Sequence, residues 1–427
     1  YKILYNDAVA MTGGQPVDGP VSPAAVAQAC RAEGVIRIAV VSDDIGKFRR
    51  GDFPPGTSFH DRAELMPVQR ELREVKGVSV LLYEQVCATE KRRRRKRGKA
   101  EDPKRFAYIN PLVCEGCGDC SVESNCLSIE PRETVFGRKR KVNLSSCNKD
   151  FSCLNGFCPS FVTVEGAKPR KAATATLDLP DLPEPALPAI DGTHNIVVTG
   201  IGGTGVVTIG AVLTMAAHLD DKGAAMIEMA GLAQKGGAVH IHCRLANRPE
   251  DISAIRVAVG EAHAVIGGDL VVTAGAKTLG LMATGRTGAV VNSHEIVTGD
   301  FTRNRDFRIP GKDLQLALEA RLQDGLAVFD ATELAAKLLG DSIYSNMMVF
   351  GAAWQRGLVP LSLDAILRAI ELNGAAVEQN KAAFAYGRWA MAHPKDAAKL
   401  LAAEVVAKPV TPDERIARRA AHLEAYQ

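Results

Sequence analysis

No run of about 18 or more apolar residues occurs in this sequence, so we expect no membrane-spanning helix. The N-terminal residues also lack the basic and apolar regions of a signal peptide. The net charge is only +3, and nothing in the overall composition points to nucleic acid. A chain of 427 residues that is 46% hydrophobic and 24% charged is typical of a globular protein with roughly two to four domains.

Cysteine is the residue type whose placement is most informative. Of the ten cysteines, seven fall between Cys114 and Cys158, and the other three are scattered. Scattered disulfides would suggest secretion, whereas a tight group in a long chain suggests metal or iron–sulfur ligation in a reducing compartment. We therefore expect a cytoplasmic protein.

The grouped cysteines form two series, Cys114-x2-Cys117-x2-Cys120 followed by Cys126, and Cys147-x5-Cys153-x4-Cys158-Pro159. Bacterial two-cluster ferredoxins use Cys-x2-Cys-x2-Cys-x3-Cys-Pro twice, and each fourth cysteine binds the other cluster. In the second series, Asp150 stands where the middle cysteine would be, and a carboxylate can ligate iron in place of a thiolate.

The spacing predicts two clusters, the first a 4Fe–4S cluster and the second of the 4Fe–4S or the 3Fe–4S type. The predicted ligands of the first cluster are Cys114, Cys117, Cys120 and Cys158. Those of the second are Cys126, Cys147, Cys153 and, as a further candidate, Asp150. Structural zinc is an alternative, but cysteines at two-residue spacing do not match its two separated ligand pairs. A single cluster with three spare thiols also stays open.

The rest of the sequence reads as α/β structure. Strand patterns at residues 1–5, 35–42 and 78–83 alternate with helical patterns at 23–31 and 60–75, which predicts a parallel sheet. A basic run at residues 91–97 is expected to be a solvated tether, with docking of an acidic protein or of nucleic acid as alternatives. Five prolines at residues 168–192 predict an extended linker.

A second α/β region begins at Asn195. Strands are predicted at 195–199, 224–228, 239–245, 264–267 and 289–291, a helix at 206–219, and mainly helices after Asp330. Between the first strand and its helix, Gly200-Ile-Gly202-Gly203-Thr204-Gly205 matches G-x-G-x-x-G, with Glu228 near the end of the next strand. These residues alone predict either a dinucleotide site or a tight turn without a ligand.

Three segments together resemble the 2-oxoacid:ferredoxin oxidoreductase family, and most closely its large fused indolepyruvate-type members. Residues 5–15 (Tyr-Asn-Asp-Ala-Val-Ala-Met-Thr-Gly-Gly-Gln) resemble the end of the thiamine diphosphate motif. The cysteine-rich segment resembles the ferredoxin domain, and the chain from Asn195 onward, including residues 228–237, resembles the gamma domain. Because that gamma domain is not known to use nicotinamide, the resemblance favours a glycine loop without a dinucleotide.

The resemblance implies a thiamine diphosphate and Mg²⁺ site that is only partly present. The side chain of Asn6 and the carbonyl of Ala8 would bind Mg²⁺, which prefers oxygen ligands. The other residues expected to contact the cofactor are Met11, Thr12, Gly13, Gly14 and Gln15. The Gly-Asp-Gly part of the motif and the catalytic glutamate are expected upstream of Tyr1, so we interpret the chain as an excerpt of a longer polypeptide.

The implied reaction is the oxidative decarboxylation of a bulky aryl 2-oxoacid, such as indolepyruvate, to an acyl-CoA. Electrons would pass through the clusters to ferredoxin or another acidic acceptor, with CoA as the co-substrate. The implied partners are that acceptor, the upstream part of the polypeptide and a second copy of the protein, with neither nucleic acid nor membrane. An electron-transfer protein in which a two-cluster ferredoxin module is fused to a nucleotide-binding domain is the alternative.

The implied fold is α/β. Residues 1–98 would be the C-terminal part of a thiamine diphosphate-binding α/β domain, and 99–167 a two-cluster ferredoxin-like α+β domain. Residues 168–192 would be the Pro-rich linker, and 193–427 a Rossmann-like gamma domain with a helical C-terminal part.

Overall fold

The computed structural model describes residues 1–6, 19, 21–86, 88–96, 98–134, 136–167, 177, 179–230, 237–296, 301, 304, 306–402 and 411–424. The chain folds as two compact units. Unit 1 consists of Tyr1–Pro169, Ala230–Ala238 and Val297–Ile309. Unit 2 consists of Arg170–Met229, Val239–Ile296 and Pro310–Gln427. The domain boundaries expected from the sequence stay a prediction. None of the helices in the described ranges is long and apolar enough to span a membrane.

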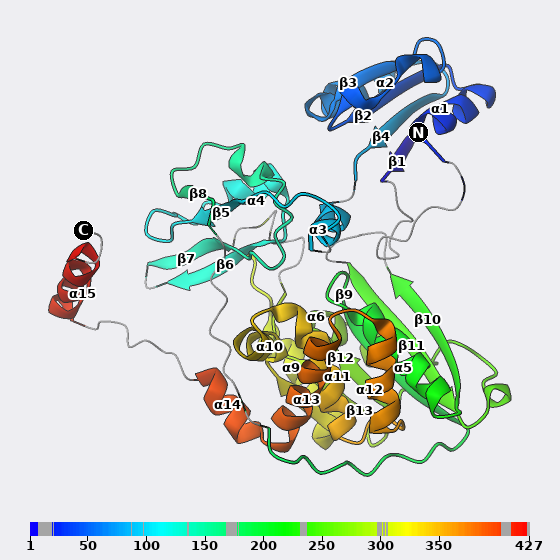
Figure 1. The fold of residues 1–427 in the computed structure, drawn as a ribbon, viewed down its shortest axis with the longest axis vertical. Helices are drawn as coiled ribbons and strands as arrows, with labels where there is room; N and C mark the ends of the chain where they lie inside the picture. Colours follow the sequence, from blue (N-terminus) through cyan, green and yellow to red (C-terminus); the bar gives the residue numbers. More distant parts are fainter. Residues whose placement is uncertain are drawn as a thin grey trace. The chain divides into compact units, whose positions relative to one another are not determined.

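Unit 1 begins with a four-stranded parallel sheet (Figure 1). Its order is β1-β4-β2-β3, with β1 at Lys2–Tyr5, β2 at Arg37–Ser42, β3 at Ser58–Asp61 and β4 at Ser79–Glu84. Alternate residues of β2 face opposite sides, where α1 (Pro23–Ala32) and α2 (Leu65–Glu74) pack on them. Burial of both faces explains why the strands read as continuous apolar runs. The predicted parallel α/β character of this region is confirmed.

The predicted helix at 60–75 is wrong at its start. Residues up to Asp61 belong to β3, and the helix α2 begins only at Leu65. Between them the Asp61 carboxylate accepts a hydrogen bond from the Ala63 amide, and the Glu64 carboxylate accepts one from the Asp61 amide. This capping box separates strand from helix.

The cysteine-rich part of unit 1 is built from two antiparallel strand pairs and one short helix. Strand β5 (Arg105–Ile109) pairs with β8 (Phe161–Glu165), and β6 (Ile129–Thr134) forms a hairpin with β7 (Gly137–Val142). Helix α4 (Asp119–Ser124) and a 3₁₀ turn at Ser152–Leu154 lie between the pairs in the chain.

Unit 2 is centred on a six-stranded sheet with the order β10-β11-β9-β12-β13-β14. Its strands are β9 (Thr193–Ile201), β10 (Gly223–Ala230), β11 (Ala238–Ala246), β12 (Ala264–Gly267), β13 (Gly288–Asn292) and β14 (Leu326–Phe329). The pairs from β9 through β12 and β13 to β14 are parallel. The first five strands lie where the sequence predicts them, and β14 is not among the predicted strands.

Helices cover both faces of this sheet. They are α5 (Val206–Leu219), α6 (Leu270–Thr273), α7 (Ala276–Leu281), α9 (Gly311–Leu322), α10 (Ala331–Leu339), α11 (Ser345–Gln355), α12 (Leu363–Asn373), α13 (Val377–Ala392) and α14 (Pro394–Ala402), with α15 (Pro412–Glu424) following. Ile196 and Val198 of β9 face α5, α11, α12 and α13, whereas Val197 faces α6 and α9. As expected, the elements that the structure describes after Asp330 are helical.

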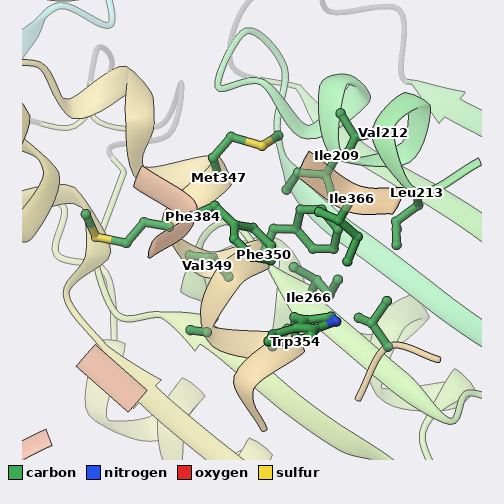
Figure 2. Packing of buried hydrophobic residues seen from close by; sticks show 14 of the residues in the cluster. Ile209, Val212, Leu213, Ile266, Met347, Val349, Phe350, Trp354, Ile366 and Phe384 are labelled. Carbon is green, nitrogen blue, oxygen red and sulfur yellow. The ribbon is translucent and has the colours of Figure 1, made fainter. Parts of the chain in front are cut away.

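The larger core lies on the face of α11 (Figure 2). Phe350 of α11 and Phe384 of α13 meet edge to face with ring centroids 5.3 Å apart. Trp354 is fully buried, and its indole N–H donates to the Leu361 carbonyl at 2.8 Å. Hydrogen bonding of the buried indole lets the ring contribute its full apolar area to the core.

Helices α11 and α13 touch through their backbones. A Cβ atom added at Gly351 would lie 2.0 Å from the Phe384 carbonyl oxygen, and one added at Gly387 would lie 1.9 Å from the Met348 carbonyl oxygen. Any side chain at either position would therefore push the two helices apart.

Residues 179–192 have no helix or strand and run over the surface of unit 2. Leu179, Leu182 and Ile190 pack against the larger core, and the Gln355 side chain donates to the Pro183 carbonyl at 2.7 Å. This part of the predicted linker is extended and bound to its unit.

Candidate metal centres

The first group of thiols gathers around Cys120, at the start of α4. Burial raises the pKa of the Cys120 thiol to about 11. The neighbouring charges of Cys117, Cys114 and Cys158 act in the same direction, and the Arg140 guanidinium opposes them. Cys158 comes from the second sequence series, and its Sγ lies 3.0 Å from the Ser160 hydroxyl. Cys114, Cys117 and Cys158, the other cysteines predicted for the first cluster, thus lie within electrostatic range of Cys120.

The second group gathers around Cys153, in the 3₁₀ turn. Burial raises the pKa of the Cys153 thiol to about 12, and the nearby charges of Cys126, Cys147 and Asp150 act in the same direction. Cys126 of the first series thus lies within electrostatic range of Cys153, as do Cys147 and Asp150. Whether the two groups hold clusters stays a prediction.

Backbone and hydroxyl donors already point at this second group. The Ser128 amide donates to Cys126 Sγ at 3.4 Å, and the Lys149 amide donates to Cys147 Sγ at 3.4 Å. The Ser152 hydroxyl donates to Asp150 Oδ2 at 3.1 Å. Such hydrogen bonds stabilise negative charge on the ligand atoms and help to set the potential of an iron–sulfur cluster.

The loops carrying these residues use strained backbone. Asn125, Lys149 and Phe151 have φ angles of 46°, 51° and 58°, in the left-handed region. A side chain in that region costs about 1–2 kcal/mol per residue. Lys149 and Phe151 flank Asp150, so the strained backbone of the second loop lies on both sides of this candidate ligand.

The longer gap before Cys126 has a structural reason. Helix α4 continues to Ser124, whose hydroxyl donates to the Cys120 carbonyl, and Asn125 ends the helix in the left-handed conformation. Compared with the three-residue gap of ferredoxins, the gap before Cys126 has two more residues, and α4 occupies most of it.

Within the described ranges, no three His, Cys, Asp or Glu side chains come close enough together to hold a single metal ion. A cavity of about 190 Å³ lies between the groups, lined by Cys120, Cys153, Cys158 and the exposed Phe157 among others.

The basic run is not a solvated tether, and that expectation is wrong. Residues 88–96 form helix α3 (Ala88–Lys96), and the side chains of residues 91–95 are half-buried. Lys91 pairs with Asp43 at 2.9 Å, and the buried Glu90 pairs with Arg94 at 3.2 Å. Arg95 donates to the Asn148 carbonyl at 2.5 Å, so α3 joins the parallel sheet to the second cysteine loop within unit 1.

The glycine loop forms the expected strand-to-helix turn between β9 and α5. A Cβ atom added at Gly205 would lie 2.1 Å from the Asn346 amide nitrogen, which donates to the Gly205 carbonyl at 3.2 Å. Packing against Asn346 accounts for this glycine without any ligand. That the loop binds no dinucleotide stays a prediction.

The residues predicted to bind thiamine diphosphate fall mostly outside the described ranges. Asn6 is described and directly follows β1. Ala8, Met11, Thr12, Gly13, Gly14 and Gln15 lie outside the residues that the structure describes. The carboxyl end of a parallel strand is the usual position for a ligand-binding residue in an open α/β sheet, and Asn6 has that position.

Part of the chain is similar to known proteins. Residues 195–390 match the family described as pyruvate ferredoxin/flavodoxin oxidoreductase. The indolepyruvate oxidoreductase subunit IorB of Archaeoglobus fulgidus is 25% identical over 176 residues, 41% of this chain and 83% of that protein. The subunit of the same name from Pyrococcus horikoshii is 26% identical over 45% of this chain and 94% of that protein.

A solved structure, the gamma subunit of a keto/oxoacid ferredoxin oxidoreductase from Geobacter sulfurreducens, is 21% identical. The similarity covers 47% of this chain and 98% of that chain, with a TM-score of 0.33.

Proposed function

We propose that this chain, whose residues 195–390 match the family described as pyruvate ferredoxin/flavodoxin oxidoreductase, carries the electron-transfer part of an enzyme that oxidatively decarboxylates an aryl 2-oxoacid. Indolepyruvate is the first choice of substrate, an acyl-CoA is the product, and ferredoxin or another acidic protein accepts the electrons. The observation that carries the proposal is the gathering of seven cysteines and Asp150 into two groups of four in this same chain.

The first group, Cys114, Cys117, Cys120 and Cys158, is proposed to hold one 4Fe–4S cluster. Cys126, Cys147, Cys153 and Asp150 are proposed to hold the second. A bound cluster supplies one-electron transfer, which a 2-oxoacid oxidation needs twice. Because the thiols of Cys120 and Cys153 have raised pKa values, loading must displace their protons. The amides of Ser128 and Lys149, which donate to Cys126 Sγ and Cys147 Sγ, would stabilise these two thiolates.

The thiamine diphosphate site is proposed to include Asn6 and Ala8 as Mg²⁺ ligands, with residues 11–15 lining the cofactor. The upstream part of a longer polypeptide would complete it and supply the catalytic groups. Asn6 contributes a side-chain oxygen at the end of β1, which suits a hard cation.

Asp150 is expected to make the second cluster labile at one iron. A carboxylate is a harder donor than a thiolate and suits the irons of a cluster less well. Mild oxidation of the wild-type protein should therefore give a three-iron signal in electron paramagnetic resonance. Asp150→Cys should abolish that signal, while Asp119→Cys, on the nearby helix α4, should leave it unchanged. A signal that persists in Asp150→Cys would remove Asp150 from the labile iron.

The substrate class rests on Met11 and on the names of the similar subunits. Members of the family that use pyruvate resemble one another in having asparagine at this position, where an amide can bind a small polar substrate. A thioether offers no such donor and instead packs well against aromatic rings. Loss of a polar partner costs about 1–3 kcal/mol. We therefore expect kcat/KM for pyruvate to be lower than that for aryl substrates by about tenfold or more.

The test is an assay of the full-length enzyme with CoA and a viologen acceptor. Indolepyruvate and phenylpyruvate are compared with branched 2-oxoacids and pyruvate, and Met11→Asn is compared with the wild type. We expect kcat/KM to favour the aryl substrates and Met11→Asn to raise the value for pyruvate. A wild-type kcat/KM for pyruvate equal to that for indolepyruvate would contradict the substrate class.

A further inference from the structure

A buried arginine lies against the first group of thiols. Arg140, on β7, is 1% exposed, and the charges that act on it include those of Cys120, Cys114 and Cys117. A buried charge is costly unless other groups compensate for it. The other basic residues of this strand, Arg138, Lys139 and Lys141, are half-buried or exposed, so burial singles out Arg140.

The loop that carries the first thiols is packed directly on β7. Gly116 has a φ of 74°, and a Cβ atom added there would lie 2.3 Å from the Arg138 carbonyl oxygen. The loop backbone thus lies in contact with the strand, two residues from Arg140.

The other side of the guanidinium is covered by an aromatic ring. Arg140 Cζ lies 4.5 Å from the centroid of the Phe301 ring, and Phe301 is 2% exposed. Phe301 belongs to the segment Val297–Ile309, which is part of unit 1 although it follows β13 in the chain. The same segment is held to β7 by Arg138, whose Nη1 donates to the Phe307 carbonyl at 2.7 Å. A desolvated cation over an aromatic face is stabilised by about 2 kcal/mol.

We propose that Arg140 sets the reduction potential of the first cluster and that Phe301 holds its guanidinium in place. This inference rests on the proposed binding of a cluster by Cys114, Cys117, Cys120 and Cys158. Reduction adds one electron, so the cluster and its thiolates gain one negative charge. A guanidinium is always charged in proteins, and in a site shielded from water its attraction for the added charge is strong. Arg140 therefore stabilises the reduced state and raises the potential.

The charges that act on Cys153, in the second group, are those of Cys126, Cys147 and Asp150, and Arg140 is not among them. The second loop has basic residues of its own, because Arg95 donates to the Asn148 carbonyl and Lys149 pairs with Asp102 at 2.8 Å. The effect of Arg140 should therefore be confined to the potential of the first cluster.

The experiment is an anaerobic redox titration followed by electron paramagnetic resonance, with iron and sulfide measured in every variant. Arg140→Gln keeps a polar side chain of similar length and removes the charge. At a fixed applied potential, the ratio of reduced to oxidised first cluster should fall about tenfold, which equals a shift of 59 mV for one electron. The potential of the second cluster should not change. The same exchange is also made in a Cys153→Ala protein, which is expected to hold only the first cluster. This variant shows which of the two measured potentials has shifted.

Three further variants separate a charge effect from a packing effect. Arg140→Lys keeps the charge and should keep the ratio within about threefold of the wild type. Phe301→Leu leaves Arg140 in place and should shift the potential in the same direction as Arg140→Gln, by a smaller amount. Lys141→Gln is the matched control on the same strand, because Lys141 is exposed and already paired with Glu130 at 3.3 Å. It should cause no shift.

An Arg140→Gln protein with full iron and an unchanged potential would overturn the role of Arg140 and leave cluster binding intact. If Arg140→Gln does not assemble the cluster, Phe301→Leu decides, and an unshifted wave in that variant overturns the proposal. A wild-type protein without iron would overturn the proposed function and this inference together. Iron and sulfide analysis reveals that failure before any potential is measured.

Discussion

Anaerobically purified protein is expected to hold about eight iron and eight sulfide atoms per chain, and a single cysteine exchange should remove about half of them. Cys120→Ala and Cys153→Ala each delete the thiol at the centre of one group. Because the groups share no residue, each exchange should abolish one cluster and leave the other.

Cys30→Ala is the control for this experiment. Cys30 lies in α1, packs against the core of the parallel sheet and belongs to neither group. Its exchange should leave the iron content unchanged. About four iron atoms in the wild type would remove the second cluster, and a complete loss of iron in both centre variants would show that the two groups are not independent.

Gly387→Val is expected to destabilise unit 2 by at least about 3 kcal/mol. Overpacking a well-packed core costs about 1–3 kcal/mol when side chains can move aside, and here the obstacle is backbone. The added Cβ atom would lie 1.9 Å from the Met348 carbonyl oxygen, so α11 and α13 would have to separate around Trp354 and Phe384. Urea unfolding followed by tryptophan fluorescence measures the change.

Gly280→Ala is the matched control, since nothing lies within 4 Å of an added Cβ atom there. Gly280 is in helix α7, where alanine is preferred over glycine by about 0.5–1 kcal/mol. That exchange should be neutral or slightly stabilising. If the two variants unfold at the same urea concentration, the backbone contact between α11 and α13 does not limit the stability of the unit.

Much of the fold was predictable where sequence pattern and local chemistry agree. Helix α5 occupies Val206–Leu219 as predicted, because a glycine loop precedes it and its apolar residues continue without interruption. Ser362 caps the start of α12, and its hydroxyl accepts a hydrogen bond from the Ala365 amide. In such places the signal is contained in a few neighbouring residues.

Two of the errors concern short strands at the edges of sheets. Strands β3 and β14 have four residues each and lie at the ends of their sheets, and most of their residues are half-buried. Four residues give too little periodicity to separate a strand from the start of a helix. Their identity is decided by the neighbouring strand, which a local pattern cannot contain.

The proposed ligand residues of the candidate site could be predicted from the sequence, whereas the residues packed around them could not. Cysteine spacing indicated both groups, including the crossing of Cys126 and Cys158. Arg140 gave no signal, because it is one of four consecutive basic residues and only packing decides which of them is buried. Its neighbour Phe301 is even less accessible to sequence reasoning, since nothing local connects it with β7.

The segment Val297–Ile309 has a consequence for the order in which the protein is made. The hydrogen bond from Arg138 to Phe307 joins residues 169 positions apart, and Arg140 likewise depends on Phe301 to cover it. A ribosome adds about 5–20 residues per second, so all seven grouped cysteines are synthesised many seconds before the ring that covers Arg140. During that interval the thiols of the first group are made but their surroundings are incomplete. The closed surroundings of Arg140 can therefore form only after residue 309 has left the ribosome.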